Sequence, residues 1–310
     1  MLDAPPLPPF PKRDPKGHKG TFGTVVVIGG CAVRERHMVG APSLAARAAI
    51  RSGVGLAQLV MPAGVLDAGI SLCPSATGIP LTVDEDGAVV PHEAAHTLDG
   101  LLHSCNALVV GPGLGAGEGP RVLALRAAQQ EEAPVILDAD ALNALAEIPE
   151  LARDFRAAAI LTPHPGEYRR LAASLGISLD PVDPRTRPEA AAALGQRLGC
   201  IVVLKGSGTI VSDGQRTWQN DTGGSELATG GTGDVLAGII AGIVAQFVAF
   251  GLHPRQPRPA SRPLDLFDAA RLAVRAHGLA GDRWASRQGA NAGLMATELA
   301  DELPAVLASM

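Results

Sequence analysis

One short segment combines glycines, hydroxyl side chains and a carboxylate directly before a long apolar stretch. Gly230, Gly231 and Gly233 surround Thr232 there, and Asp234 follows in the expected first turn of a helix. Because glycines let the main chain turn sharply, the N–H groups of residues 231–233 can converge as an anion hole, backed by the positive end of the helix dipole. A carboxylate beside such a hole can take a proton from a hydroxyl that attacks a phosphoryl group. Asp234 is therefore our candidate catalytic base, with helix capping as the alternative.

A second segment, residues 201–214, has the pattern of a strand, a turn of small residues and another strand. The turn lacks the Gly-Lys-Ser/Thr order of a Walker A loop. With Lys205 and Thr209 at its edges, it can nevertheless cradle a nucleotide phosphate with its backbone donors. An ordinary hairpin turn is the alternative interpretation.

Three further strand ends carry polar or glycine-rich sequence. Thr162 and His164 each precede a proline, which favours a stiff, extended loop that presents the histidine to a ligand; a structural or merely exposed histidine is the alternative. Residues 107–116 supply a glycine-rich approach for a ligand. After residues 135–137, Asp138 is a candidate for holding Mg²⁺ through water, whereas Asp140 has the position of a helix cap.

The elements that would position these residues alternate between short apolar strands and Ala/Leu-rich helices. Several strands are apolar at every position, as expected when both faces of a sheet are covered. A helix is expected at 42–52, with Pro42 as its first residue and Gly53 as the left-handed residue beyond its end. This alternation predicts a mostly parallel sheet between two helical layers, with ligands at the carboxyl ends of the strands. The expected strands are 24–28, 57–61, 107–110, 135–137, 158–161, 201–204 and 209–211.

Composition narrows the function further. The 310 residues carry a formal net charge of −5 and only 3% aromatic residues, which argues against a nucleic-acid partner. The four cysteines lack the spacing of zinc or redox motifs, and this fits a cytoplasmic location. The uncharged stretch 235–252 reaches the lower limit for a membrane span, but its glycines and Gln246 favour a buried helix and no membrane association.

The chain is expected to form one domain. Residues 1–18 have no apolar core of a signal peptide and are interpreted as a Pro-rich tail, followed by a single domain at 19–310. The Pro-rich stretches 180–188 and 253–263 are expected to be exposed loops.

Together, the segments resemble the ADP- or ATP-dependent NAD(P)H-hydrate dehydratases of the ribokinase-like superfamily. The resemblance covers the chain from about Lys19 to Pro304. Six motifs occur in the family's order: His-Lys-Gly, Gly-Pro-Gly-Leu-Gly, Leu-Asp-Ala-Asp-Ala-Leu-Asn, Thr-Pro-His-Pro-Gly-Glu, Leu-Lys-Gly-x-Gly-Thr and Ala-Thr-Gly-Gly-Thr-Gly-Asp-Val-Leu. The resemblance implies a three-layer α/β/α ribokinase-like fold with a mostly parallel central sheet.

The resemblance also implies an activity, which is repair of hydrated NADH or NADPH (NADHX or NADPHX). ADP or ATP, with Mg²⁺, would phosphorylate the 6-hydroxyl, and elimination of phosphate would restore the ring; ADP is favoured. A homo-oligomer, in particular a tetramer, is implied as well. Asp234 would be the base, Ala41, Gly113, Gly115 and His164 would contact the hydrated dinucleotide with it, and Lys205, Gly206, Ser207, Gly208, Thr209 and Gly233 would line the nucleotide site.

The sequence departs from the family in two respects. The short start leaves no room for the epimerase domain that family members often carry, so a separate epimerase chain is expected to be a functional partner. The segment 220–227 also differs from the commoner spelling, which leaves the role of Ser225 and Glu226 open.

Three other functions would share parts of this pattern. A kinase acting on a vitamin-precursor alcohol would share the glycine-rich loop and Asp234. An NAD-dependent dehydrogenase fits the glycine spacing at 111–116, but a proline and late glycines disturb its tight turn. A nucleotide sensor without catalysis would be expected to lack Asp234.

Overall fold

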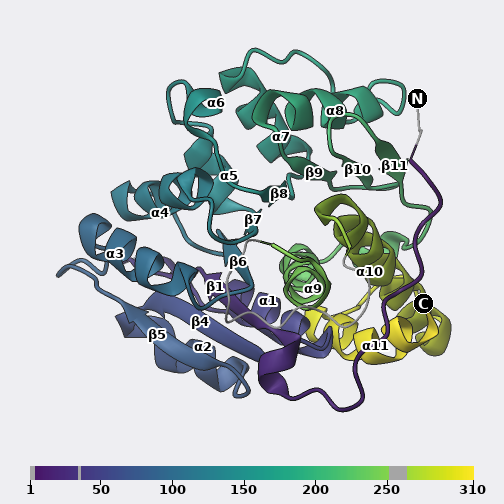
Figure 1. The fold of residues 1–310 in the computed structure, drawn as a ribbon, viewed down its shortest axis with the longest axis horizontal. Helices are drawn as coiled ribbons and strands as arrows, with labels where there is room; N and C mark the ends of the chain where they lie inside the picture. The colour runs from purple at the N-terminus through teal and green to yellow at the C-terminus, as the bar shows by residue number, and fades with distance from the viewer. Residues whose placement is uncertain (1–3, 34–35, 251–263) are drawn as a thin grey trace.

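A nine-stranded sheet forms the centre of the molecule in the computed structural model, which describes residues 4–33, 36–250 and 264–310 (Figure 1). Its strand order is β11-β10-β9-β8-β7-β6-β1-β4-β5, and β10 pairs antiparallel with β9 and β11 while the other pairs are parallel. The strands are β1 (Thr24–Ile28), β4 (Leu56–Pro62), β5 (Thr77–Leu81), β6 (Ala107–Val110), β7 (Val135–Leu137), β8 (Ala159–Leu161), β9 (Ile201–Leu204), β10 (Ile210–Ser212) and β11 (Thr217–Gln219), with a separate hairpin of β2 (Cys31–Val33) and β3 (Arg36–Met38).

Helices cover both faces of the sheet. In β1, Val25 and Val27 belong to one apolar cluster and Val26 and Ile28 to the other, because successive side chains of a strand point to opposite faces. The predicted three-layer α/β/α fold is confirmed. The first layer contains α1 (Gly40–Arg51), α2 (Leu66–Leu72), α9 (Thr232–Phe247), α10 (Leu266–Gln288) and α11 (Ala296–Ser309), and the second contains α3 (Pro91–Leu102), α4 (Glu118–Gln129), α5 (Asp140–Leu145), α6 (Leu151–Asp154), α7 (Pro165–Ser174) and α8 (Arg187–Leu198).

The strand order changes direction between β1 and β6. From β1 the chain proceeds to β4 and β5 on one side, and then returns to place β6 on the other side. In open α/β sheets, such a switch point leaves a crevice at the carboxyl ends of the strands, where ligands bind. Gly29 follows β1 here, and a Cβ on it would lie 2.2 Å from the carbonyl oxygen of Pro112. Only glycine therefore permits this close approach of the two loops.

Helices α1 and α9 pack tightly and in register. A Cβ on Gly238 would lie 2.1 Å from the carbonyl oxygen of Ala45, and one on Gly242 would lie 3.0 Å from that of Ala49. Both pairs have the same offset, so the helices run parallel. One turn earlier, the same offset places Asp234 opposite Ala41, at the carboxyl edge of the sheet.

Most of the expected elements are present. All seven expected strands form, although the 158–161 strand begins one residue later and the 209–211 strand lies at 210–212. The strands β2, β3, β5 and β11 were not expected. The helix expected from Pro42 begins earlier, at Gly40, so Pro42 is its third residue and not its first. The apolar stretch beyond Val235 forms the buried helix α9, as expected, up to Phe247. Among the described residues, no helix has the length and apolar character needed to cross a membrane.

The Pro-rich stretch 180–188 is not exposed along its whole length. Arg187, at the end of the 180–188 stretch expected to be exposed, begins α8 and is buried. The expectation is therefore wrong at this end, because the Arg187 guanidinium donates to backbone carbonyls inside the molecule. The 253–263 stretch lies outside the described residues.

Candidate active site

The carboxyl ends of three neighbouring strands bring an acid, a hydroxyl and a lysine together. Asp138 follows β7, Thr162 follows β8 and Lys205 follows β9. The Lys205 ammonium lies 2.8 Å from Oδ1 of Asp138, and the Thr162 hydroxyl donates to the same oxygen over 2.7 Å. Glu167 approaches Lys205 at 3.8 Å. Asp138 and Glu167 are both buried, so this is a charged cluster within the protein.

Asp234 lies beside this cluster at the start of α9. Gly231 precedes the helix in a left-handed conformation (φ 93°), and no side chain caps the helix start. The N–H groups of the first turn have no intrahelical partners, so they are available to an anion. A Cβ on Gly233 would lie 3.6 Å from the Lys205 ammonium. The predicted anion hole and Lys205 are therefore adjacent, and capping does not explain Asp234.

Burial and charge set the ionisation of the cluster. Burial raises the pKa of Asp234 to about 7; the negative charge of Asp138 adds to this rise and Lys205 opposes it. Burial alone would lower the pKa of Lys205, but Asp138 and Glu167 reverse this and raise it. Burial also raises the pKa of Glu167. At neutral pH, Lys205 is charged and Asp234 is close to its midpoint, which suits a general base.

A cavity of about 440 Å³ opens next to Lys205 and the start of α9. All the nucleotide-binding residues expected from the sequence line it, from Lys205 to Thr209 together with Gly233. The turn at 205–209 joins β9 to the antiparallel β10, so it is a hairpin turn. Its contact with a nucleotide stays a prediction. The volume lies within the range of small-molecule sites. The other lining residues are Asn220, Thr222, Gly223, Gly224, Ser225, Leu227, Ala228, Thr232, Leu236, Val274, His277 and Gly278.

Two side chains that the sequence did not point to hold the walls of this cavity. His277 donates from Nε2 to the carbonyl oxygen of Thr232 over 2.9 Å, and burial lowers its pKa to about 4, so it is neutral at pH 7. Behind the 205–209 turn, Arg187 donates to the carbonyl oxygens of Leu204 and Ser207. Neither residue belongs to a recognisable motif.

The segment with Ser225 and Glu226 also borders this cavity. The sequence did not indicate the role of these two residues. Ser225 lines the cavity directly. Glu226 is buried and accepts a hydrogen bond from the backbone N–H of Gly224 over 2.6 Å, which fixes the turn.

Three of the residues expected to contact the dinucleotide, Ala41, Gly113 and Gly115, lie at the start of α1 and in the loop after β6. A Cβ on Gly113 would lie 3.4 Å from that of Ala41, so the loop after β6 touches the start of α1. The N–H of Gly115 donates to Asp140 over 2.8 Å. The interpretation of Asp140 as a helix cap is wrong, because its carboxylate holds this loop. Ala139, with a φ of 51°, turns Asp138 and Asp140 toward different partners.

His164 is placed differently from the other expected residues. It caps α7: its Nδ1 accepts from the N–H of Gly166 over 2.9 Å, and its own N–H donates to Glu167. The side chain is 51% exposed and belongs to neither the nucleotide cavity nor the Gly113–Ala41 contact in the described structure. A contact between His164 and the dinucleotide stays a prediction.

In the described part of the chain, the acidic side chains of the candidate site are not arranged as the ligands of a directly bound metal ion. Within the described ranges, no group of three or more His, Cys, Asp or Glu side chains is arranged to hold a metal ion. Oδ1 of Asp138 is shared by Lys205 and Thr162. A role of Asp138 toward Mg²⁺ through water stays a prediction.

Comparison with known proteins identifies related sequences and structures. A family model described as NAD(P)H-hydrate dehydratase matches residues 25–305. The ADP-dependent (S)-NAD(P)H-hydrate dehydratase of Neisseria meningitidis serogroup B is 37% identical over 94% of this chain and 87% of its own length. The ADP/ATP-dependent NAD(P)H-hydrate dehydratase of Bacillus subtilis, co-crystallised with ATP/Mg²⁺, is similar with a TM-score of 0.72 and 29% identity, covering 96% of this chain and 94% of the other.

Other relatives are longer. The bifunctional NAD(P)H-hydrate repair enzyme Nnr of Coxiella burnetii is 37% identical over 94% of this chain, but the match covers only 52% of its own length. The chain thus spans about half the length of several curated relatives that it matches.

Proposed function

Because this chain belongs to the NAD(P)H-hydrate dehydratase family, we propose that it restores hydrated NADH or NADPH in a reaction that consumes ADP or ATP. The nucleotide phosphorylates the 6-hydroxyl of the hydrated nicotinamide ring, and loss of phosphate regenerates the reduced cofactor. One observation carries the proposal: Asp234, with its pKa raised to about 7, directly follows Gly233, which lines the cavity of about 440 Å³, and the charges of Asp138 and Lys205 act on it.

The first step is transfer of a phosphoryl group. Asp234 accepts the proton of the 6-hydroxyl, whose oxygen attacks the terminal phosphorus of the nucleotide, and the bond to the departing AMP or ADP breaks. The N–H groups of residues 231–233, at the start of α9, and the neighbouring Lys205 ammonium would stabilise the negative charge on the migrating group. Mg²⁺, when bound, would neutralise charge on the phosphates.

The second step is elimination. The C–O bond to the new phosphate breaks, a proton leaves the neighbouring ring carbon, and the electron pair of that C–H bond forms the ring double bond. Phosphate and the reduced cofactor are the products, so one phosphate is released for each ring restored.

The direct test combines the purified chain with both epimers of hydrated NADPH, Mg²⁺ and either ADP or ATP. Return of the absorbance of the reduced ring and release of phosphate are followed together. We expect equal amounts of the two products, with one epimer consumed and the other left until an epimerase is added. A phosphorylated compound that accumulates without phosphate release would favour the small-molecule kinase instead.

A further inference from the structure

A groove of about 450 Å³ lies on the outer side of the 205–209 turn. The middle of this turn lines both the groove and the nucleotide cavity. In the hairpin that the turn closes, Thr209 and Asn220 line the nucleotide cavity. Their neighbours Ile210 and Gln219 pair with each other across the hairpin and line the groove. Because successive side chains of a strand point to opposite faces, the turn is a wall shared by two ligand-sized spaces.

The Pro-rich stretch 180–188, which the proposed function does not use, supplies one wall of this groove. Proline side chains are rigid rings, and their apolar faces suit the flat face of an aromatic ring. Val182 of the same wall is 52% exposed, so the groove can be reached from solvent. The apolar residues of the stretch that line the groove are Pro181, Val182, Pro184 and Pro188, and Pro165 at the start of α7 adds to them.

Arg187 brings a buried positive charge to the groove. Its guanidinium donates to the carbonyl oxygens of Leu204 and Ser207, and its Nε is buried without a hydrogen-bond partner among the described residues. Burial lowers the pKa of Arg187, and no carboxylate in the described part of the chain counters this fall. Buried charges in proteins are normally paired with a charge of opposite sign. A negatively charged group in the groove would complete this pairing.

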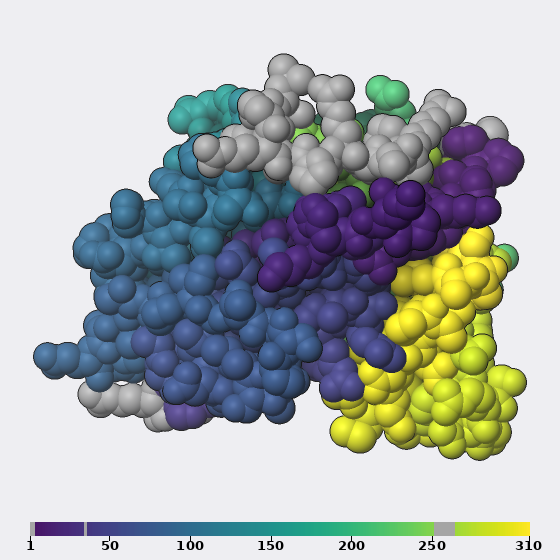
Figure 2. Space-filling model, turned by 60° about the horizontal axis from the view of Figure 1, so that its bottom comes forward, coloured from purple at the N-terminus to yellow at the C-terminus, as the bar shows by residue number. Residues whose placement is uncertain are grey.

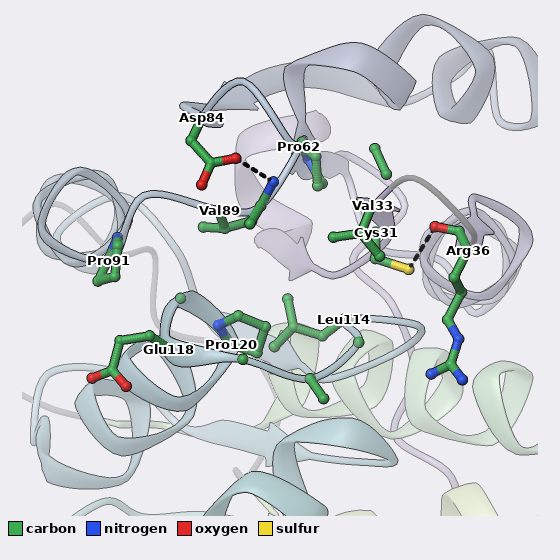
Figure 3. A pocket seen from close by; sticks show the side chains of 17 residues that line it. Cys31, Val33, Arg36, Pro62, Asp84, Val89, Pro91, Leu114, Glu118 and Pro120 are labelled. Atoms are coloured by element: carbon green, nitrogen blue, oxygen red, sulfur yellow. Dashed lines mark hydrogen bonds between the residues drawn. The ribbon is translucent and has the colours of Figure 1, made fainter.

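The cavity beside the loop after β6 differs in this respect. Its volume is about 290 Å³, and Gly115, one of the residues expected to contact the dinucleotide, lines it. Figure 3 shows the charged ends of Arg36 and Glu118 turned away from this space. Glu118 is paired with Arg121 at 2.7 Å. The groove at Arg187 instead combines apolar walls with a buried cation that has no acidic partner among the described residues.

We propose that this groove binds an aromatic carboxylate, with the ring against the prolines and the carboxylate paired with Arg187, and that this ligand strengthens nucleotide binding. The site goes beyond the proposed function, because its ligand takes no part in the repair reaction. Gly206 and Gly208 have φ values of 140° and 63°, and glycines give the turn much conformational freedom to lose. A ligand that packs against the outer face orders the turn in advance and so lowers the entropic cost of binding the nucleotide.

Binding is tested by isothermal titration of the whole chain with 2-naphthoate and with its neutral analogue 2-naphthamide. We expect a Kd of about 1 mM or below for 2-naphthoate without nucleotide. The amide should bind at least about tenfold more weakly, because it carries no charge to pair with Arg187. Saturating 2-naphthoate should lower the Kd for ADP at least about fivefold, and ADP should lower the Kd for 2-naphthoate by the same factor.

Val182→Glu places a carboxylate at the groove, where it either repels the ligand or pairs with Arg187 in its place. This variant should lose 2-naphthoate binding and keep the wild-type Kd for ADP alone. Leu72→Glu, at an apolar side chain that is 51% exposed, is the matched control and should bind both ligands like the wild type. Thermal melting shows whether each variant is folded.

Four results would overturn the inference: equal binding of acid and amide, full binding of 2-naphthoate by Val182→Glu, displacement of 2-naphthoate by ADP, or an unchanged Kd for ADP in its presence. Lack of ADP binding by the wild type would instead contradict the proposed function. The titration with 2-naphthoate alone distinguishes the two failures, because it needs no nucleotide.

Discussion

The carboxyl group of Asp234 is held near the midpoint of its ionisation by its surroundings. Burial is the largest cause of its raised pKa, the charge of Asp138 raises it further, and Lys205 lowers it. The Lys205 ammonium donates to Asp138 over 2.8 Å, so a change at Asp138 also alters the effect of Lys205 on the pKa of Asp234. The cluster therefore sets the pH at which the proposed base becomes available.

This arrangement predicts a specific pH dependence. The kcat/KM for hydrated dinucleotide should rise with pH along an acid limb with an apparent pKa near 7, because Asp234 must lose its proton to act as a base. Asp138→Asn should move this limb to lower pH, since it removes a negative charge and frees Lys205. Asp67→Asn, on the exposed side of α2, is the control and should leave the limb in place. A limb that does not move in Asp138→Asn would exclude this electrostatic coupling.

At the scale of residues, the sequence predicted those site residues whose chemistry is indicated by their neighbours along the chain. Asp234 stands after three glycines, and the 205–209 turn combines glycines with a lysine. His277 and Arg187 were missed because their partners are distant in the sequence: His277 binds a carbonyl 45 residues away. A lone histidine in an alanine-rich helix carries no local signal for such a contact.

At the scale of elements, close packing of α1 on α9 places the base. The carbonyl oxygen of Ala45 occupies the position that a Cβ on Gly238 would need. Any side chain at this position must push the two helices apart. The separation would shift Asp234 relative to Ala41, one turn away.

Gly238→Ala should therefore lower both stability and turnover. We expect a loss of about 1–3 kcal/mol in the free energy of unfolding, as for other overpacked cores, together with a reduced kcat. Chemical denaturation and steady-state kinetics measure the two effects. Gly100→Ala in α3 is the control, because a Cβ at that position meets no atom within 4 Å and should be neutral or stabilising. Wild-type stability in Gly238→Ala would show that the helices do not need this contact.

Arg187 holds the nucleotide turn from behind. Its guanidinium spans the carbonyl oxygens of Leu204 and Ser207, and lysine cannot reproduce this planar geometry. Arg187→Lys should raise the Kd for the nucleotide by about tenfold, the effect of losing one or more buried hydrogen bonds. The affinity for hydrated dinucleotide should change little. Isothermal titration with each ligand measures both, and equal losses for the two ligands would show that Arg187 supports the whole fold instead of the turn.

In the central sheet, the strands that the sequence missed are those at the two edges; the separate β2–β3 hairpin was missed as well. Central strands are apolar at every position and stand out, as in β6 and β9. β5 contains Gly78 and Pro80, which are tolerated only because this strand has a neighbour on one side. β11 has three residues of mixed burial. Both strands form because they pair with a neighbouring strand, and the composition of a segment does not indicate such pairing.

At the scale of the whole molecule, the N-terminal segment is a structural part of the described chain. Residues 4–22, purple in Figure 2, cross the surface beside the C-terminal helix in yellow. Ala4 donates to the carbonyl oxygen of Thr217, and Arg271, fully buried, donates to that of Pro5 over 2.7 Å. Phe10 meets Phe247 of α9 edge to face with ring centres 5.5 Å apart. The sequence indicated a Pro-rich tail here, but it did not predict that this segment contacts the rest of the protein.

The segment should contribute to stability without changing catalysis. Phe10→Ala removes an aromatic pair and apolar contact with α9, so we expect a loss of about 1–3 kcal/mol in the free energy of unfolding. The KM values for nucleotide and hydrated dinucleotide should be unchanged. Leu72→Ala, at an apolar side chain that is 51% exposed, is the control and should cost little. A melting temperature of Phe10→Ala equal to that of the control would contradict a structural role.

The fold and its layers were within reach of the sequence because they follow from local periodicity and the order of strands. The cavity at Lys205 to Thr209 was not, because segments that lie far apart in the sequence enclose it. The homo-oligomer implied by the resemblance stays a prediction.

The central claim is that Asp234 takes the proton of the attacking hydroxyl beside the cavity at Lys205 to Thr209. The most direct test measures turnover of hydrated NADPH by Asp234→Asn under saturating nucleotide. We predict a fall in kcat of at least about 100-fold, the lower end of what a positioned base supplies, with nucleotide affinity little changed and the fold intact by thermal melting. Activity within a few-fold of the wild type would remove Asp234 from the reaction and contradict the account.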